Sequence, residues 1–334
     1  MKTKKLVPLI ALAAVVAILG ISLAFLKAGG EEETETGVAL TDLDAGAVTA
    51  IAYTKTEDEL SVALSRPATG EDAQWTLDGN PELPLDQGKV SAIATDLAGL
   101  KAVRELTDVT DTDGMGFDEP TMSFTLSGTD GASLGLTVGA KNDMTDAYYV
   151  KVDGKNSVYT VSTSDLASMC KTEKDLYAAQ AMTDITTDDA VSMTLQTTGE
   201  ELRFTKTDDT WTLDGDPEYA LDQDVVSRMA QTVCDLKSTW SITNPEADSL
   251  YGLDAPSAVV TLRTADGKTV TCSFGTTDPV DSTACFMRCS SAPGVVYEVA
   301  ADNLSAYAYT KSTLKAATPE SAETAEAAAD YPVS

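Results

Sequence analysis

Acidic side chains are the most numerous groups in this chain that could do chemistry. Asp and Glu contribute 53 residues, whereas histidine is absent. The missing imidazole removes histidine-based triads, histidine general bases and most catalytic zinc sites. Paired carboxylates could hydrolyse a glycoside, but no pair of them is set apart by an apolar sequence context. We therefore expect a non-enzymatic protein without catalytic residues or a cofactor, and rank an enzyme of the cell envelope third among the hypotheses.

One acidic loop, DTDG at residues 111–114, has some features of a calcium loop. Such loops need an oxygen ligand at the first position and a bidentate Glu at the twelfth. Val109 occupies the first position here and Pro120 the last. The acidic stretch DGDPE at residues 214–218 is expected to be a turn between a strand and a helix. Neither stretch predicts a metal site.

The five cysteines could be core residues, disulfide partners or ligands. Cys285 and Cys289 lie four residues apart on an expected strand. At about 3.3 Å per residue they are roughly 13 Å apart, too far to bridge each other. A disulfide between Cys272 and Cys285 on neighbouring strands stays open. An odd, unduplicated set is more typical of structural positions than of a catalytic site.

A repeat organises the chain and must position all of these groups. WTLDGNPELPLDQ at residues 75–87 returns as WTLDGDPEYALDQ at residues 211–223. The same spacing relates Leu100 to Leu236 and Gly139 to Gly275. A fixed long period indicates a duplicated structural unit. We expect a transmembrane anchor over 1–27, an acidic linker over 28–46, repeat 1 over 47–177, repeat 2 over 186–315 and a disordered tail over 316–334.

Each copy predicts one main helix and several antiparallel strands. Asp86 and Asp222 stand where a helix N-cap is expected. Apolar residues then recur at the spacing of one buried helical face, from Val90 in the first copy and from Val226 in the second. Four alternating segments follow a Gly-containing turn in each copy. The fold class is therefore α+β: two homologous, mainly antiparallel β units, each with one principal helix, behind a single transmembrane helix.

The repeated tryptophans and aspartates each allow two interpretations. Trp75 and Trp211 could be aromatic binding platforms, but a tryptophan at the start of a buried strand face is more often a core anchor. Asp118 and Asp254 could be acids or metal ligands. Beside a Gly turn and a Pro, we expect them instead to accept backbone N–H hydrogen bonds.

The N-terminus predicts a membrane anchor. Three lysines in MKTKK precede an apolar run over Leu6–Leu26, which spans roughly 30 Å as a helix, the thickness of a bilayer core. A cleaved signal peptide is the alternative, but its apolar region is usually about 7–15 residues. The lysines favour a cytoplasmic N-terminus, a single pass through the cell membrane and an extracytoplasmic bulk. The net charge of −30 disfavours nucleic acid and anionic lipid headgroups as partners.

These motifs resemble the domain-of-unknown-function 4340 family. The resemblance rests on WTLDG, the Asp-capped helix, YGLDAP at residues 251–256 and a late VYEV, behind an N-terminal anchor. The first copy departs from the most specific motif, because Met115 and Phe117 replace Tyr and Leu. We expect the motif residues to be structural rather than catalytic. They are Trp75, Asp78, Gly79, Asp86, Gly116, Asp118, Pro120, Trp211, Asp214, Gly215, Asp222, Tyr251, Gly252, Leu253, Asp254 and Pro256.

The resemblance implies an accessory protein of an ABC-type transporter, because members of this family resemble proteins encoded beside such transporters. The leading hypothesis is a membrane-anchored, extracytoplasmic interaction module whose partner is a membrane protein, such as a transporter permease. The alternative is a solute- or envelope-polymer-binding protein that uses a cleft between the repeats. Exposed tryptophans lining such a cleft would favour the alternative.

Overall fold

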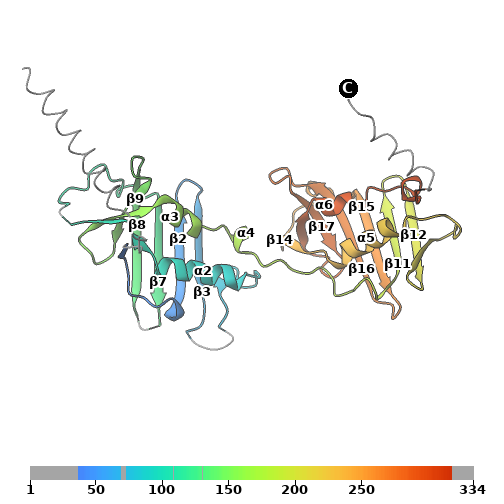
Figure 1. Ribbon diagram of the computed structural model, residues 1–334, viewed down its shortest axis with the longest axis horizontal. Helices are drawn as coiled ribbons and strands as arrows, with labels where there is room; N and C mark the ends of the chain where they lie inside the picture. Colours follow the sequence, from blue (N-terminus) through green and yellow to red (C-terminus); the bar gives the residue numbers. More distant parts are fainter. Residues whose placement is uncertain (1–36, 69–72, 108, 130, 318–334) are drawn as a thin grey trace, which may run out of the picture.

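Two similar units make up the folded part of the chain (Figure 1). The computed structural model describes residues 37–68, 73–107, 109–129 and 131–317. Unit 1 contains β1 to β10 with α2, α3 and α4, and unit 2 contains β11 to β18 with α5 and α6. Each unit has its own cluster of buried apolar residues. Figure 1 shows the units as two lobes, with α4 (Glu173–Leu176) between the two sheets.

Unit 1 is built on an eight-stranded antiparallel sheet with the strand order β4-β3-β2-β7-β8-β9-β10-β6. The first strand of the unit, β1, pairs separately with β5. The strands are β1 (Val38–Ala39), β2 (Val48–Lys55), β3 (Leu60–Ser65), β4 (Thr76–Leu77), β5 (Lys101–Ala102), β6 (Arg104–Leu106), β7 (Met122–Gly128), β8 (Ser133–Asn142), β9 (Ala147–Val152) and β10 (Val158–Ser162).

Unit 2 repeats this sheet strand for strand, in the order β13-β12-β11-β15-β16-β17-β18-β14. Its strands are β11 (Ala190–Thr197), β12 (Glu201–Thr207), β13 (Thr210–Leu213), β14 (Ser238–Ile242), β15 (Ala258–Thr264), β16 (Thr269–Thr277), β17 (Ala284–Cys289) and β18 (Val296–Ala300). The predicted duplication and the α+β class with mainly antiparallel strands are therefore confirmed.

One twelve-residue helix packs on each sheet, α2 (Gln87–Ala98) in unit 1 and α5 (Gln223–Cys234) in unit 2. The predicted caps are confirmed. Asp86 accepts a hydrogen bond from the Lys89 N–H and Asp222 accepts one from the Val225 N–H, each at 3.1 Å. The predicted apolar faces are buried, except that Cys234 is only partly so. A shorter helix follows β10 in unit 1 and β18 in unit 2. These helices are α3 (Thr163–Met169) and α6 (Asp302–Ser305).

A glutamine at the first position of each main helix holds the repeated tryptophan. In unit 1 the Gln87 Oε1 accepts the Trp75 N–H at 2.7 Å, and the Gln87 Nε2 donates to the Trp75 carbonyl at 3.1 Å. Gln223 makes the same two bonds to Trp211, at 2.8 and 2.9 Å. The side-chain amide thus acts as a short extra strand beside the tryptophan backbone. This clamp explains why the stretch from Trp to Gln is repeated.

The Gly-containing turn before β7 lies directly against β8, and the turn before β15 lies directly against β16. In unit 2 the Thr276 N–H donates to the Tyr251 carbonyl at 2.9 Å, and a Cβ on Gly275 would overlap that carbonyl oxygen. Gly252 has a φ of +68°, which favours glycine. Unit 1 repeats the arrangement with Met115, Gly116, Gly139 and Ala140. Close backbone approach therefore requires these glycines.

The units extend beyond the limits expected from the sequence. Residues 38–46 were expected in the linker, but β1 pairs with β5 and Leu40 lies in the core of unit 1. In unit 2 the corresponding contact comes from residues before the expected start, where Ala181 pairs with Lys237 and the Met182 N–H donates to the Leu236 carbonyl. The local sequence of these two segments shows no strand period, so only the pairing reveals their place.

The expected anchor over 1–27, the linker up to residue 36 and the tail from residue 318 lie outside the described residues. Among the residues that the structure describes, no helix combines the length and apolarity needed to cross a bilayer.

We expect Gly275→Ala to destabilise unit 2 by about 3 kcal/mol, because the new methyl group would force β16 away from the turn. Chemical unfolding combined with hydrogen exchange of the β15 and β16 amides measures the effect. Gly294→Ala is the matched control, since nothing lies within 4 Å of a Cβ there. Equal stability of the two variants would contradict the close approach.

We expect Gln223→Ala to cost about 2 kcal/mol, because both backbone groups of the buried Trp211 lose their partner. The unfolding midpoint in urea measures this change. Gln231→Ala, on the exposed face of the same helix, should shift the free energy of unfolding by less than about 0.5 kcal/mol. A similar loss in both variants would show that the clamp adds nothing beyond helix propensity.

Candidate functional site

The repeated tryptophans are core residues rather than binding platforms. Trp75 and Trp211 are each 3 % exposed. The guanidinium of Arg66 lies 4.7 Å from the Trp75 ring centroid and covers it further. The indole Nε1 of Trp75 is buried and has no acceptor among the residues that the structure describes. Trp211 borders a small pocket of about 250 Å³ in unit 2, but both side chains are almost fully enclosed, and the core-anchor prediction is confirmed.

The aspartates of the two WTLDG motifs tie the turn to the neighbouring strand. The Asp78 carboxylate accepts a hydrogen bond from the Ser65 hydroxyl at 2.7 Å, and Asp214 accepts one from Thr205 at 2.9 Å. The glycines that follow, Gly79 and Gly215, have φ values of +88° and +83°. These residues shape a tight turn and bring no reactive group to a cavity.

Asp118 and Asp254 do not have the role expected from the sequence. Both are exposed, and neither carboxylate makes a hydrogen bond within the described parts of the chain. Around them the motif holds its position by other contacts: the Pro120 carbonyl accepts the Thr56 hydroxyl at 2.8 Å, and Leu253 is buried. The expectation that these two carboxylates accept backbone N–H groups was wrong, because the close approach of the glycines already fixes the turn.

Tyr251 of the second motif has a packing role. Its ring meets Phe286 edge to face, with 5.1 Å between the ring centroids. Its hydroxyl accepts the Glu246 N–H at 3.2 Å. Met115 replaces this tyrosine in unit 1, so the contact belongs to unit 2.

The acidic loop at residues 111–114 forms a local turn in which the Asp113 N–H donates to the Asp111 carboxylate at 2.9 Å. In the described ranges, no three His, Cys, Asp or Glu side chains converge in a way that could hold a metal ion.

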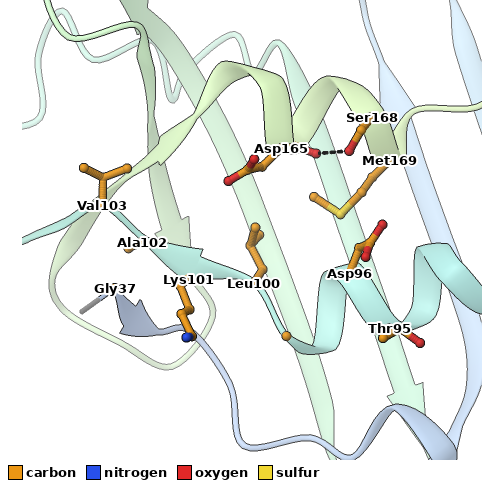
Figure 2. A pocket seen from close by; sticks show the side chains of 11 residues that line it. Gly37, Thr95, Asp96, Leu100, Lys101, Ala102, Val103, Asp165, Ser168 and Met169 are labelled. Carbon is orange, nitrogen blue, oxygen red and sulfur yellow. Dashed lines mark hydrogen bonds between the residues drawn. The ribbon is translucent and has the colours of Figure 1, made fainter. Parts of the chain in front are cut away.

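A surface pocket of about 520 Å³ lies in unit 1 between α2, β5 and α3. Figure 2 shows Asp96 and Asp165 on the two helices, with Met169 beside them, and Lys101 on the strand side. Within the described chain, neither carboxylate forms an ion pair with Lys101. The Ser168 hydroxyl donates to the Asp165 carbonyl of its own helix at 2.7 Å. Among the described residues that line the pocket, no hydrogen bond pairs a nucleophile with a base.

An aromatic contact joins the end of unit 1 to the edge of unit 2. The rings of Tyr177 and Trp240 meet edge to face at 5.5 Å, and Trp240 packs against the core cluster of unit 1. The hydroxyls of Tyr177 and Ser238 are hydrogen-bonded at 2.9 Å in a buried setting. Tyr177 also pairs through its backbone with Leu85, next to α2. This joint, made by Tyr177, Ser238 and Trp240, connects the two cores.

An ion pair lies beside the joint. The Lys174 ammonium group on α4 contacts the carboxylate of Glu298 on β18 and lies 3.6 Å from Asp281. Glu298 is 5 % exposed, so the pair neutralises a buried charge. Burial lowers the pKa of Lys174, but the hydrogen bond to Glu298 and the nearby acids outweigh burial and raise the pKa overall.

The sequence analysis did not predict the joint, although a comparison of the two copies contains a signal for it. Trp240 and Ser238 correspond to Arg104 and Ala102 of the first copy. A buried serine and an added tryptophan at these positions distinguish the unit 2 strand that faces the other unit. Departures from the repeat are therefore more informative about contacts between units than the repeated residues are.

The disulfide between Cys272 and Cys285, which the sequence left open, is not present. All five are free. Cys285 lies opposite Thr277 on β16, whereas Cys272 lies opposite Cys289. A bulge between Phe274 and Thr277 shifts the register between β16 and β17. A bridge between Cys272 and Cys285 is excluded because the two residues are not neighbours across the sheet.

Comparison with known protein families agrees with this architecture. The model of the family described as domain of unknown function (DUF4340) matches residues 75–217 and again residues 211–328. Both matches begin at a repeated tryptophan, Trp75 or Trp211. No curated protein and no solved structure matches the chain. Because the two matches together cover most of its length, the chain belongs to the domain-of-unknown-function 4340 family, as a tandem-repeat member.

Proposed function

We propose that this protein is a membrane-anchored, extracytoplasmic, non-enzymatic accessory module that binds a membrane protein, with an ABC-type transporter permease as the partner. The anchor is inferred from the apolar run over Leu6–Leu26 after three lysines. The transporter is inferred from the family resemblance alone.

The observation that carries the interaction role is a pair of exposed apolar side chains at equivalent places in the two units. Met144, in the turn between β8 and β9, is 96 % exposed, and Val280, in the turn between β16 and β17, is 94 % exposed. They are separated by the repeat spacing of 136 residues. A single exposed apolar residue is ordinary on a protein surface. Its recurrence at both hairpin tips, among acidic residues, supports two matched contact points.

The joint supports the same function, because it fixes one hairpin-bearing unit against the other. Tyr177, Trp240 and the ion pair of Lys174 with Glu298 restrain the chain between the sheets. Two tips held at a set separation can bind one partner simultaneously, which raises the affinity above that of either contact alone.

The alternative, a solute- or polymer-binding protein with a cleft between the repeats, loses the feature that would have favoured it. Trp75 and Trp211 are enclosed in the two cores, and a small pocket that Trp211 borders is lined by residues of unit 2 alone. The pocket in Figure 2 lies within unit 1, so it does not supply that cleft.

Site-specific photo-crosslinking in native membranes tests the proposal. A photoreactive residue at position 144 or 280 is expected to capture a membrane protein, identified by mass spectrometry as a transporter subunit. Position 103 is the matched control, because Val103 is also apolar and 67 % exposed but is not at a hairpin tip. The double variant M144D/V280D should reduce co-purification of the same subunit at least about tenfold, since two charged groups replace the apolar contacts.

Recovery of the full chain alone, or equal capture from position 103, would contradict the interaction role. Capture of a membrane protein unrelated to transport would retain the role and overturn the choice of partner.

A further inference from the structure

Two cysteines face each other across neighbouring strands of unit 2. Cys272 on β16 and Cys289 on β17 are register partners. Both are fully buried, with relative exposures of 0 %. Cys285 shares β17 with Cys289 but lies opposite Thr277 and Val299. Among the five cysteines of the chain, these two alone are register partners of each other.

The position of the pair in the hydrogen-bond ladder brings the side chains close together. The Ser290 N–H donates to the Thr271 carbonyl at 2.8 Å, so the adjacent pair of Cys272 and Cys289 is the non-hydrogen-bonded type. In such pairs the Cα atoms are about 4.5 Å apart and the side chains are closest. Disulfides span Cα separations of about 4.4–6.8 Å. Formation of a bond between these sulfurs therefore needs no movement of the strands.

Unit 1 provides an internal comparison for this pair. The same two positions are occupied there by Leu136 and Val152, which are register partners on β8 and β9. Both are buried apolar residues of the core. In unit 2 both members of the pair are cysteine, so two thiols take the place of an ordinary apolar contact. If cysteine served only as a small core residue at one of these positions, its register partner would not also need to be cysteine.

The surroundings favour Cys289 as the attacking sulfur. A hydrogen bond from the Cys272 thiol lowers the pKa of Cys289, and the Ser291 hydroxyl, which donates to the Cys289 sulfur at 3.1 Å, lowers it further. The same contact with Cys289 raises the pKa of Cys272. Cys289 is the last residue of β17, and the exposed Ser290 follows it. Local opening of this turn would expose Cys289 before the rest of the strand.

We propose that Cys272 and Cys289 form a cross-strand disulfide when the folded protein meets a small-molecule or protein disulfide oxidant. The Cys289 thiolate attacks one sulfur of the oxidant, the oxidant's disulfide breaks, and one thiolate leaves. Cys272 then gives up its proton and attacks the mixed disulfide at Cys289, which releases the second thiolate. Overall, two cysteine thiols lose two protons and two electrons, and the oxidant is reduced to two thiols. The disulfide would join β16 to β17 covalently. It would lie beside the segment between α4 and β11, where the Met182 carbonyl accepts a hydrogen bond from the Cys289 thiol in the reduced state.

Oxidation of the purified full-length chain with oxidised glutathione, followed by alkylation under denaturing conditions, tests the proposal. We expect two of the five thiols to resist alkylation. Trypsin should separate Cys272 and Cys285, both on the peptide of residues 269–288, from Cys289 on the peptide of residues 289–311. Mass spectrometry is therefore expected to find these two peptides linked, and reduction should release them. The oxidised chain should also melt at a higher temperature than the reduced chain.

Two variants assign the bond. Cys289→Val, which introduces the residue found in unit 1, should abolish the linked peptide. Cys285→Ala should retain it, although it removes a buried thiol from the same strand. If a variant fails to fold, fragmentation of the linked wild-type peptides between positions 272 and 285 still identifies which of the two cysteines is bonded to Cys289. Five alkylated thiols after oxidation, a loop within residues 269–288, or a linked peptide that survives in Cys289→Val would each overturn the proposal.

Discussion

In both units the start of the main helix is held by a single glutamine that satisfies the two backbone groups of a buried tryptophan. The neighbouring aspartate caps the helix and also donates its own N–H to the last segment of the unit, from Asp86 to the Leu176 carbonyl and from Asp222 to the Leu314 carbonyl, each at 2.8 Å. Three parts of each unit, the edge strand, the helix and the C-terminal segment, thus meet at two adjacent residues. Buried backbone groups are costly when unpaired, so this junction fixes where the helix lies on the sheet.

A second constraint acts on the opposite side of the sheet. The Gly turn before β15 approaches β16 so closely that only glycine fits at position 275, and unit 1 repeats this at Gly139. Together with the helix junction, this contact gives a structural role to Trp75, Asp86, Gln87, Gly116 and Gly139, which are all identical in the second copy. The family motif is therefore a description of how the unit folds, and its aspartates at 118 and 254 are left exposed to solvent.

The residues that distinguish the copies have a different significance. Trp240 and Ser238 adapt one edge of unit 2 to Tyr177 at the end of unit 1. Cys272 and Cys289 replace a leucine and a valine at one register pair. Duplication supplies a stable unit twice, and each copy can then change at positions that the junction and the Gly turn do not constrain. In contrast, the exposed tips at Met144 and Val280 are features that both copies have kept apolar.

Much of the fold could be predicted from the sequence, because the signals involved are local and occur twice. The Asp caps, the helical period from Val90 and Val226 and the alternation along β7 to β10 depend on neighbouring residues alone. The repeat then showed that one unit is made twice, and the buried tryptophans followed from their place on a strand face.

Tertiary structure alone decided which distant residues meet. The strands β6 and β14, which come after the main helices in the chain, lie at the edge of the sheet beside β10 and β18. The strand β1 joins unit 1 although its sequence resembles a linker. The register of β16 and β17, shifted by one residue at a bulge, places Cys289 opposite Cys272 and Cys285 opposite Thr277. Strand register and edge pairing depend on bulges, turns and the competition of many alternative pairings. Local sequence patterns carry no record of that competition, so these contacts become visible only in the folded chain.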